Sequence, residues 1–396
     1  MGKFNRKYIL NSLNQILTIA WEECLAIFKD SGVRLILIIA GIAYPLLYGV
    51  VYLGENVDEI PVGIVDECKT SESRHYAQKL DATRELSVVE CLNMDEGQDL
   101  MKSRKIHAII VIPSDFSSNR INPYKQTVIS VYVNMATMFI YKNVALAANF
   151  VMLDESYEIS KSQMLAQGAT FKEAEVNAEP IKNEMIATFN PGSGFASFFV
   201  PGVLILIIHQ LLFLGIGMLA GTRREKNESG KLVEQKNSLH AVVYKEVIGR
   251  SIAYFAIYSI ISAYILTIVS RIFGLPHLCS TWEIYRFMVP FLLAVIFFSQ
   301  TWSVFIKNRE TGMVLFLFAS VILLLLSGLT WPWSNFPTFW KYFSYIFPAT
   351  PGVQGFVKIN CMGANIGEIM REFMTLWVQA IFYFLTAGFA YRYVNK

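Results

Sequence analysis

The sequence has few charged residues. Of its 396 residues, 16% are Asp, Glu, Lys or Arg and 54% are hydrophobic. Soluble domains carry roughly 25% charged residues, so this composition favours an integral membrane protein. The formal net charge of +3 is too small to indicate a nucleic-acid partner. We also expect no cleaved signal peptide, because the N-terminal stretch lacks a small-residue cleavage site.

Residue patterns typical of enzymes are absent as well. The chain has no GxSxG, HExxH or CxxC motif, and its five histidines do not have the spacing of metal ligands. NESGKL at 227–232 resembles the end of a phosphate-binding P-loop. However, Glu225 stands at the first glycine position and Leu232 replaces the Ser or Thr that holds magnesium. We therefore expect no catalytic residues, cofactor, metal or ATP site on this chain.

Long apolar runs are abundant instead. A helix needs roughly 20 apolar residues to cross a bilayer. Six stretches qualify: 35–53, 196–220, 250–270, 287–306, 313–330 and 373–391. None of them contains Asp or Glu. Proton- and sodium-coupled carriers usually place such residues at membrane depth, so a secondary carrier is disfavoured.

Lys and Arg predict the orientation of these spans. With the N-terminus inside, the inner segments hold sixteen Lys and Arg and the short outer loops hold five. The positive-inside rule then places both termini in the cytoplasm and residues 54–195 outside. Of the five cysteines, Cys24 is inside on this topology. The other four are outside, where the pairs Cys68–Cys91 and Cys279–Cys361 are either disulfides or free thiols.

The insert at 54–195 has the pattern of a folded α/β domain. Strands are expected at 62–66, 86–92, 108–113 and 128–134, alternating with helices at 72–82 and 95–104. A long helical stretch over 136–188 follows, and Asn190-Pro191 ends it. The predicted fold class is thus a polytopic α-helical membrane protein with six transmembrane helices and an extracytoplasmic α/β domain between the first and second.

The N-terminal region, residues 1–34, is predicted to be cytoplasmic. Apolar residues recur at helical spacing over 8–28, and Glu22 and Glu23 make the stretch amphipathic. We interpret it as a helix lying on the cytoplasmic membrane surface. A short cytosolic helix without lipid contact is the alternative.

Two sets of polar residues within 196–396 are candidates for function. The first set lies inside the spans: His209, Gln210, Gln300 and Gln379. These residues line a cavity or a subunit interface, or they form ordinary hydrogen-bonded contacts between helices. The second lies in the cytoplasmic loop 221–247 and is predicted to dock on a soluble motor, with a solvated loop as the alternative: Arg223, Arg224, Glu225, Glu228, Gly230 and Glu234.

Several motifs together carry a family resemblance. They are IPVGIVDECKTSESRHYAQKLDATRELSVV (60–89), IHAIIVIPSDFSSNRI (106–121), EPIKNEMIATFNP (179–191), RREKNESGKLVEQ (223–235) and SGLTWPWSNFPTFWKYFSYIFPATPGVQGFVKI (327–359). In order and spacing the chain resembles ABC-2 type transporter permeases, more narrowly the branch with a YhiH/YbhR-like extracytoplasmic domain. The loop departs from the family pattern, because Gly230 falls one residue late and Lys231 replaces Thr.

The resemblance implies the permease subunit of an ATP-binding cassette exporter. It implies a homo- or heterodimer in the inner (plasma) membrane, driven by a separate cytosolic ATPase that binds ATP and Mg. A periplasmic adaptor and an outer-membrane channel are further partners in such systems. The apolar, aromatic spans suit an amphiphilic or hydrophobic drug, lipid or peptide. The alternative is a membrane receptor or scaffold whose external domain binds a ligand without transport. A membrane-embedded enzyme is disfavoured by the missing catalytic motifs.

The connection between the last two spans, 331–359, is rich in proline and aromatic residues. Prolines prevent one continuous helix, and Trp and Tyr favour the membrane interface. We predict short helices that re-enter the outer leaflet and form an outer gate or an anchor. The residues concerned are Trp331, Pro332, Trp340, Phe347, Pro348 and Pro351.

Overall fold

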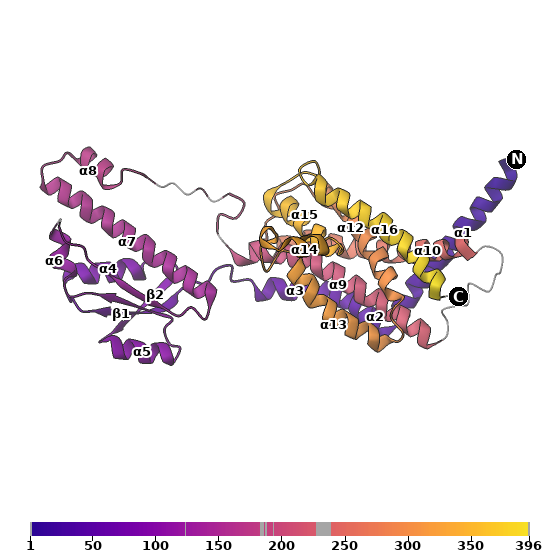
Figure 1. The fold of residues 1–396 in the computed structure, drawn as a ribbon, viewed down its shortest axis with the longest axis horizontal. Helices are drawn as coiled ribbons and strands as arrows, with labels where there is room; N and C mark the ends of the chain where they lie inside the picture. Colours follow the sequence, from indigo (N-terminus) through magenta and orange to yellow (C-terminus); the bar gives the residue numbers. More distant parts are fainter. Residues whose placement is uncertain are drawn as a thin grey trace. The chain divides into compact units, whose positions relative to one another are not determined.

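The computed structural model describes residues 2–394 except 123, 183–185, 187, 193 and 227–238. The chain divides into two compact units (Figure 1). The helical unit comprises Met1–Glu55 and Ala187–Lys396, and the α/β unit comprises Asn56–Ile186.

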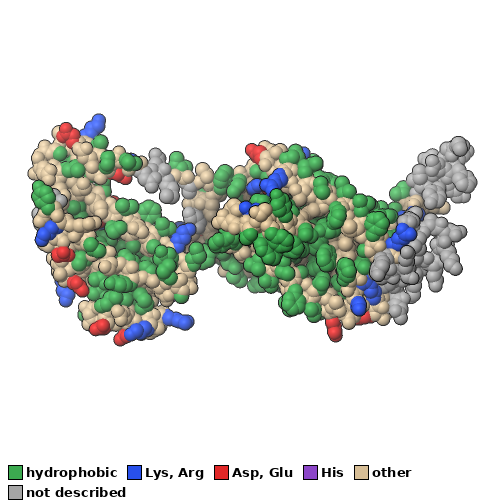
Figure 2. Space-filling model, in the orientation of Figure 1, with side chains coloured by type: hydrophobic (Ala, Val, Ile, Leu, Met, Phe, Trp, Pro, Cys, Tyr) green, Lys and Arg blue, Asp and Glu red, His purple; other side chains and the backbone are tan. Residues whose placement is uncertain are grey.

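The helical unit contains all the membrane-length helices of the described residues. Six helices are long and apolar enough to cross a membrane, at Ser31–Val51, Phe195–Glu225, Val242–Ile272, Thr281–Ser303, Arg309–Leu326 and Met370–Arg392. The six expected spans are therefore confirmed as helices, with each predicted range overlapping one of them. Figure 2 shows hydrophobic side chains covering much of the visible face of this unit, as lipid-facing helices require.

The helical elements follow one another in a simple order. They are α1 (Gly2–Lys29), α2 (Ser31–Arg34), the π-turn η1 (Leu35–Ala40), α3 (Gly41–Val51), α9 (Phe195–Glu225), α10 (Leu239–Ala263), the π-turn η2 (Tyr264–Val269), α11 (Ser270–Ile272), α12 (Thr281–Ser303), α13 (Arg309–Leu326), the 3₁₀ turn η3 (Trp333–Asn335), α14 (Thr338–Ser344), α15 (Ala349–Met362) and α16 (Met370–Val394).

Helix α9 is the centre of this unit. It is apolar on all sides and buried along most of its length, packing against α3, α12, α13 and α15. Two glycines permit close packing, since a Cβ at Gly202 would meet Leu329 at 2.3 Å and one at Gly215 would meet Leu37 at 2.3 Å. The other helices therefore take their positions around α9.

A short turn joins helices α14 and α15, and we call these two helices with their turn the hairpin. The turn between them is tied to α16, where Gln379 donates to the carbonyl of Tyr345 at 2.5 Å and Tyr383 donates to that of Ile346 at 2.6 Å. Helix α16 begins at Met370, so at ~1.5 Å per residue Tyr383 lies about 20 Å along it. The turn is thus held against the middle of α16, and two of its carbonyls are hydrogen-bonded, as backbone at membrane depth requires.

The α/β unit is built on a four-stranded sheet of order β2-β1-β3-β4. Its strands are β1 (Ile60–Asp66), β2 (Leu86–Cys91), β3 (Ala108–Ile112) and β4 (Ser130–Val133). β1 pairs in parallel with β2 and β3, whereas β4 pairs antiparallel with β3. All four expected strands are confirmed.

Helices cover both faces of the sheet. The helices of this unit are α4 (Ser71–Asp81), α5 (Met94–Lys102), α6 (Phe116–Ile121), α7 (Met138–Ala166) and α8 (Phe171–Ala178), of which α8 packs on α7. Tyr76 and Leu80 of α4 join Val144 and Val151 of α7 in the core on one face, and α5 packs on the other through Leu100. The two shorter helices expected at 72–82 and 95–104 are confirmed.

The long helix expected over 136–188 is wrong in its second half. Helix α7 ends at Ala166, because Gly168 adopts φ +91°, a left-handed conformation that stops helices. Thr170 then caps α8 and exchanges hydrogen bonds with Glu173 in a capping box. The composition alone favoured one helix because Ala, Glu and Lys are abundant on both sides of this break.

Candidate functional site

A buried ionic cluster joins four helices at the end of the helical unit where α9 ends and α10 begins. We call it the ionic cluster, and it consists of Glu23 of α1, Arg223 of α9, Glu246, Arg250 and Tyr254 of α10, and Tyr391 of α16. Two carboxylates thus face two guanidinium groups and two phenols. Residues 200 or more positions apart in the sequence meet here.

Glu23 is the centre of the cluster and is 2% exposed. Its carboxylate accepts two hydrogen bonds from Arg223, at 2.5 and 3.2 Å, and one from Tyr254 at 2.7 Å. Arg250 Nε lies 3.6 Å from the same carboxylate. Burial alone would raise the pKa of Glu23, but Arg223 and Arg250 outweigh it and hold this pKa below its ordinary value. Glu23 is therefore a charged residue buried in the helix packing.

Arg250 connects Glu23 to the rest of the cluster. It forms an ion pair with Glu246 one turn earlier on α10, and it donates to Tyr391 at 3.1 Å. The second carboxylate oxygen of Glu246 has no hydrogen-bond partner among the residues that the structure describes. An ionic cluster of this kind holds its helices in one arrangement only while every charge keeps its partner.

The packing of α1 on α10 explains why Glu23 is buried. Ile16, Ile19, Glu23 and Ile27 recur at helical spacing and share one face of α1. Gly249 of α10 lies directly beneath, where a Cβ would come within 2.7 Å of Ile19 and 2.9 Å of the carbonyl of Ile16. The glycine lets the two helices approach closely, and this contact brings Glu23 to the arginines.

A second ion pair connects α13 to the start of the first span. Both oxygens of Asp30 accept from Arg309, at 2.9 and 3.0 Å, and the same carboxylate caps α2 by accepting from Gly32 and Val33. Burial would raise the pKa of Asp30, but these hydrogen bonds and the Arg309 charge hold it below its ordinary value. This bidentate pair fixes the residues where α1 passes into the first span.

The predicted loop residues lie partly in this region. Arg223 belongs to the ionic cluster, Arg224 donates to the carbonyls of Ser303 and Ile306, and Glu225 accepts from the backbone N–H of Arg309 at 2.9 Å. These three therefore bind neighbouring helices within the chain. The remaining predicted residues, Glu228, Gly230 and Glu234, lie outside the described residues.

The sequence reasoning missed most of the cluster. Glu23 was expected on the polar side of an amphipathic helix, yet it lies on the packed side, and Glu22 is the exposed neighbour. The membrane-length helices also extend beyond the predicted runs and include Glu246 and Glu372, both buried. The predicted runs themselves hold no Asp or Glu, and the two acids lie in the helix ends beyond them. The available signal was the position of Glu23 among Ile16, Ile19 and Ile27.

The polar residues predicted inside the spans have separate surroundings. His209 is fully buried among phenylalanines, with ring centroids 5.5 Å from Phe298, and neither ring nitrogen has a hydrogen-bond partner in the part of the chain described. Within the described residues, His209 therefore makes no hydrogen-bonded contact between helices. Its side chain is also buried away from the surface of this chain, and a cavity or interface role stays a prediction.

The three glutamines do form hydrogen bonds between helices. Gln210 donates to the carbonyl of Ser320 at 3.3 Å, Gln300 donates to Ser251 at 3.0 Å, and Gln379 bonds the hairpin turn described above. These contacts agree with the interpretation as ordinary helix packing.

The aromatic and proline residues of 331–359 are divided between surface and interior. Trp331 and Trp340 are exposed, and Pro332 precedes the short turn η3. Phe347 packs on Phe298, 6.0 Å between centroids, within the bundle. Pro348 precedes α15 and Pro351 lies in its first turn, both buried. The segment therefore has a surface half and an internal half.

All five cysteines are free thiols in this structure. Burial raises the pKa of Cys279 and of Cys361 to about 11, so both remain protonated at neutral pH. Cys91 is buried against β1, and Cys68 lies beside Ser117 and Thr70.

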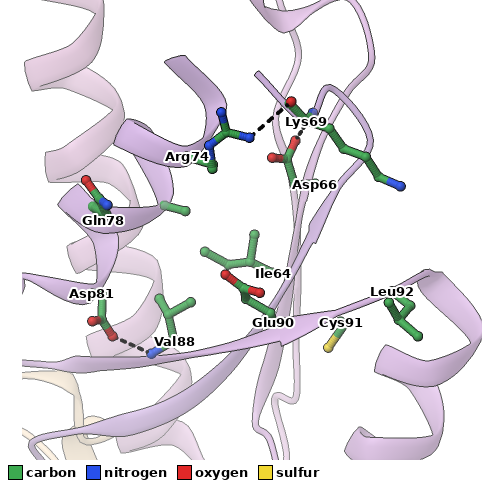
Figure 3. A pocket seen from close by; sticks show the side chains of 11 residues that line it. Ile64, Asp66, Lys69, Arg74, Gln78, Asp81, Val88, Glu90, Cys91 and Leu92 are labelled. Carbon is green, nitrogen blue, oxygen red and sulfur yellow. Dashed lines mark hydrogen bonds between the residues drawn. The ribbon is translucent and has the colours of Figure 1, made fainter. Parts of the chain in front are cut away.

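The α/β unit has a cavity of its own (Figure 3). Its volume is about 640 Å³, and it lies between α4 and the strands β1 and β2. Arg74 donates to the carbonyl of Lys69 at its rim, and the Asp81 carboxylate accepts the backbone N–H of Val88 on the edge strand β2. Charged residues of both signs line this cavity.

The six membrane-length helices, with a buried ionic cluster at one end, define a polytopic membrane protein. Residues 33–389 match the family model described as ABC-2 family transporter protein, and the chain belongs to this family. Linearmycin resistance permease protein LnrN of Bacillus subtilis (strain 168) is 31% identical over 106 residues, which is 27% of each chain. The alignment with this relative covers 27% of its length, so the family assignment rests on the match over residues 33–389.

Proposed function

We propose that this chain is the permease of an ABC exporter in the plasma membrane and that its ionic cluster transmits the motion of the ATPase to the spans. Two permeases, identical or different, pair with two ATPase subunits, which bind ATP and Mg. The observation that carries the proposal is the bonding of α1 to α9 and α10 through Glu23. A push on α1 therefore displaces the two helices that begin and end the loop 221–247.

The orientation follows from the charges. The end of the helical unit that holds the ionic cluster also holds Arg224, Lys307 and Arg309, so we place it in the cytoplasm. Helix α1 exposes Leu17, Trp21 and Phe28 on the side opposite Glu23, which suits a helix lying in the membrane interface. The α/β unit is then extracytoplasmic, and in a cell with two membranes it is the part that would meet an adaptor and channel.

Two native cysteines test this orientation. Cys68 lies in the α/β unit and Cys24 in α1, and both are partly exposed. In intact cells, a membrane-impermeant maleimide should label a variant that keeps only Cys68. A variant that keeps only Cys24 should react only after permeabilisation. The reverse pattern would refute the proposed topology.

The substrate class follows from the apolar spans and from the relative named for linearmycin resistance. We propose export of an amphiphilic or hydrophobic compound: a drug, lipid or peptide. The decisive experiment is to co-express the permease with a candidate ATP-binding cassette ATPase from the same genome and to purify the complex through a tag on the permease. A stable complex whose ATP hydrolysis rises with substrate supports the proposal. A permease that retains no ATPase supports the receptor or scaffold alternative.

A further inference from the structure

A groove between α10 with η2 and α12 has the properties of a binding site. Its volume is about 190 Å³. The lining is mostly apolar, including Phe255, Leu266, Ile284, Met288 and Leu292. Apolar cavities of ~150 Å³ hold one benzene-sized molecule, so this groove has room for a ring or a short alkyl segment.

One polar atom in this groove is left without a partner. Ser262 is 3% exposed, and its hydroxyl has no hydrogen-bond partner among the described residues. Most serines in apolar helices donate to a carbonyl one turn earlier, as Ser251 does to Val247 at 2.7 Å. A buried hydroxyl without a bond is unfavourable, so a ligand that accepts its proton would be stabilised here.

The surrounding backbone and surface suit the entry of such a ligand. Ser262 lies two residues before the π-turn η2, and π-turns occur frequently at functional sites. Tyr285 and Val289 line the groove on α12 and are 42% and 39% exposed. The groove therefore opens on the surface that faces lipid, between two membrane-length helices.

We propose that this groove binds the apolar chain or ring of an amphiphile and that the Ser262 hydroxyl donates a hydrogen bond to the hydroxyl or carbonyl oxygen of that ligand. The proposal rests on the proposed function only for its setting in a membrane. A bilayer lipid with its ester carbonyl and a diffusible amphiphile share this chemistry. The groove thus selects an apolar group with one hydrogen-bond acceptor.

The test is photolabelling of the purified permease in lipid nanodiscs, without the ATPase. Two probes are used: octanol carrying a diazirine, and phosphatidylcholine carrying a diazirine in one acyl chain. Peptides from 255–267 and 284–292 should be labelled. In Ser262→Ala, the concentration of the bound probe at half-saturation should rise roughly three- to tenfold. This is the change expected when one neutral hydrogen bond is lost. Ser262→Thr should restore it.

A pair of matched variants tests the location. Ala263→Phe places a ring in the groove and should abolish labelling of both peptides, whereas Ile260→Phe places the same ring on an exposed site of α10 and should not. If labelling by the octanol probe depends on Ser262, the ligand is a diffusible amphiphile. If labelling by the phospholipid probe depends on Ser262, the ligand is a bilayer lipid. Labelling that is absent, or unchanged in Ser262→Ala and Ala263→Phe, would overturn the proposal. The result is independent of ATPase coupling, so the two proposals can fail separately.

Discussion

Replacing Glu23 by Gln should detach α1 from the spans. The substitution preserves size and removes the carboxylate that faces Arg223 and Arg250. Removing one partner of a buried ion pair costs about 3–5 kcal/mol. Arg223 can reach solvent, since its side chain is 18% exposed, and Arg250 keeps Glu246. We therefore expect a cost at the lower end of this range, about 3 kcal/mol. This cost lowers the equilibrium constant for docking of α1 more than a hundredfold.

A double-mutant cycle with Arg223→Gln measures this contact. Thermal unfolding of the purified permease should show that the double variant is less destabilised than the two single variants added together, with an interaction of about 1 kcal/mol or more. Glu22→Gln removes an exposed carboxylate from the same turn of α1 and should have little effect. Strict additivity, or equal effects at positions 22 and 23, would refute the claim that Glu23 holds α1 in place.

Three further predictions follow from the same region and from the hairpin. Gly249→Val should force α1 away from α10, because its added Cβ meets backbone, and hydrogen exchange in α1 should then increase. The pKa values of Glu23 and Asp30 are lowered in the folded state. Both carboxylates therefore stabilise the fold fully above about pH 4.5, which is the higher of their two ordinary pKa values. This stabilisation is lost as the pH falls through the lowered pKa values. Tyr383→Phe should leave the carbonyl of Ile346 unbonded and destabilise the hairpin by about 1–3 kcal/mol.

Each of these predictions has a matched control. Ile252→Val changes an exposed residue of α10 and should leave exchange in α1 unchanged. Acid unfolding of Glu23→Gln should lose part of the pH dependence between about pH 4.5 and the lowered pKa, and an identical acid profile would contradict the role of Glu23. Tyr342→Phe removes an exposed hydroxyl near the same hairpin, so equal destabilisation by both changes would contradict the role of Tyr383.

Much of the fold could be predicted because it depends on hydrophobic pattern. Apolar runs of membrane length predicted the six helices, and β-branched runs predicted the four strands. These signals are local, since each segment needs only its own residues to show them. The break at Gly168 is also local, but a helix-rich composition on both sides concealed it.

The candidate site could be predicted only in part, because it is assembled from distant residues. Arg223 was identified from the charge density of its loop, whereas Glu23, Arg250 and Tyr391 gave no such signal. A glutamate in an amphipathic helix is usually solvated. Only the packing of α1 on Gly249 shows which of two neighbouring glutamates is buried. The pairing of charges therefore required the tertiary structure.

The central claim is that Glu23 links the ATPase to the spans. Its most direct test is ATP hydrolysis by the complete complex in lipid, with the native permease, Glu23→Gln or Glu22→Gln. We predict that all three permeases bind the ATPase and that Glu23→Gln alone loses the stimulation of hydrolysis by substrate. Full stimulation in the complex with Glu23→Gln would contradict the claim.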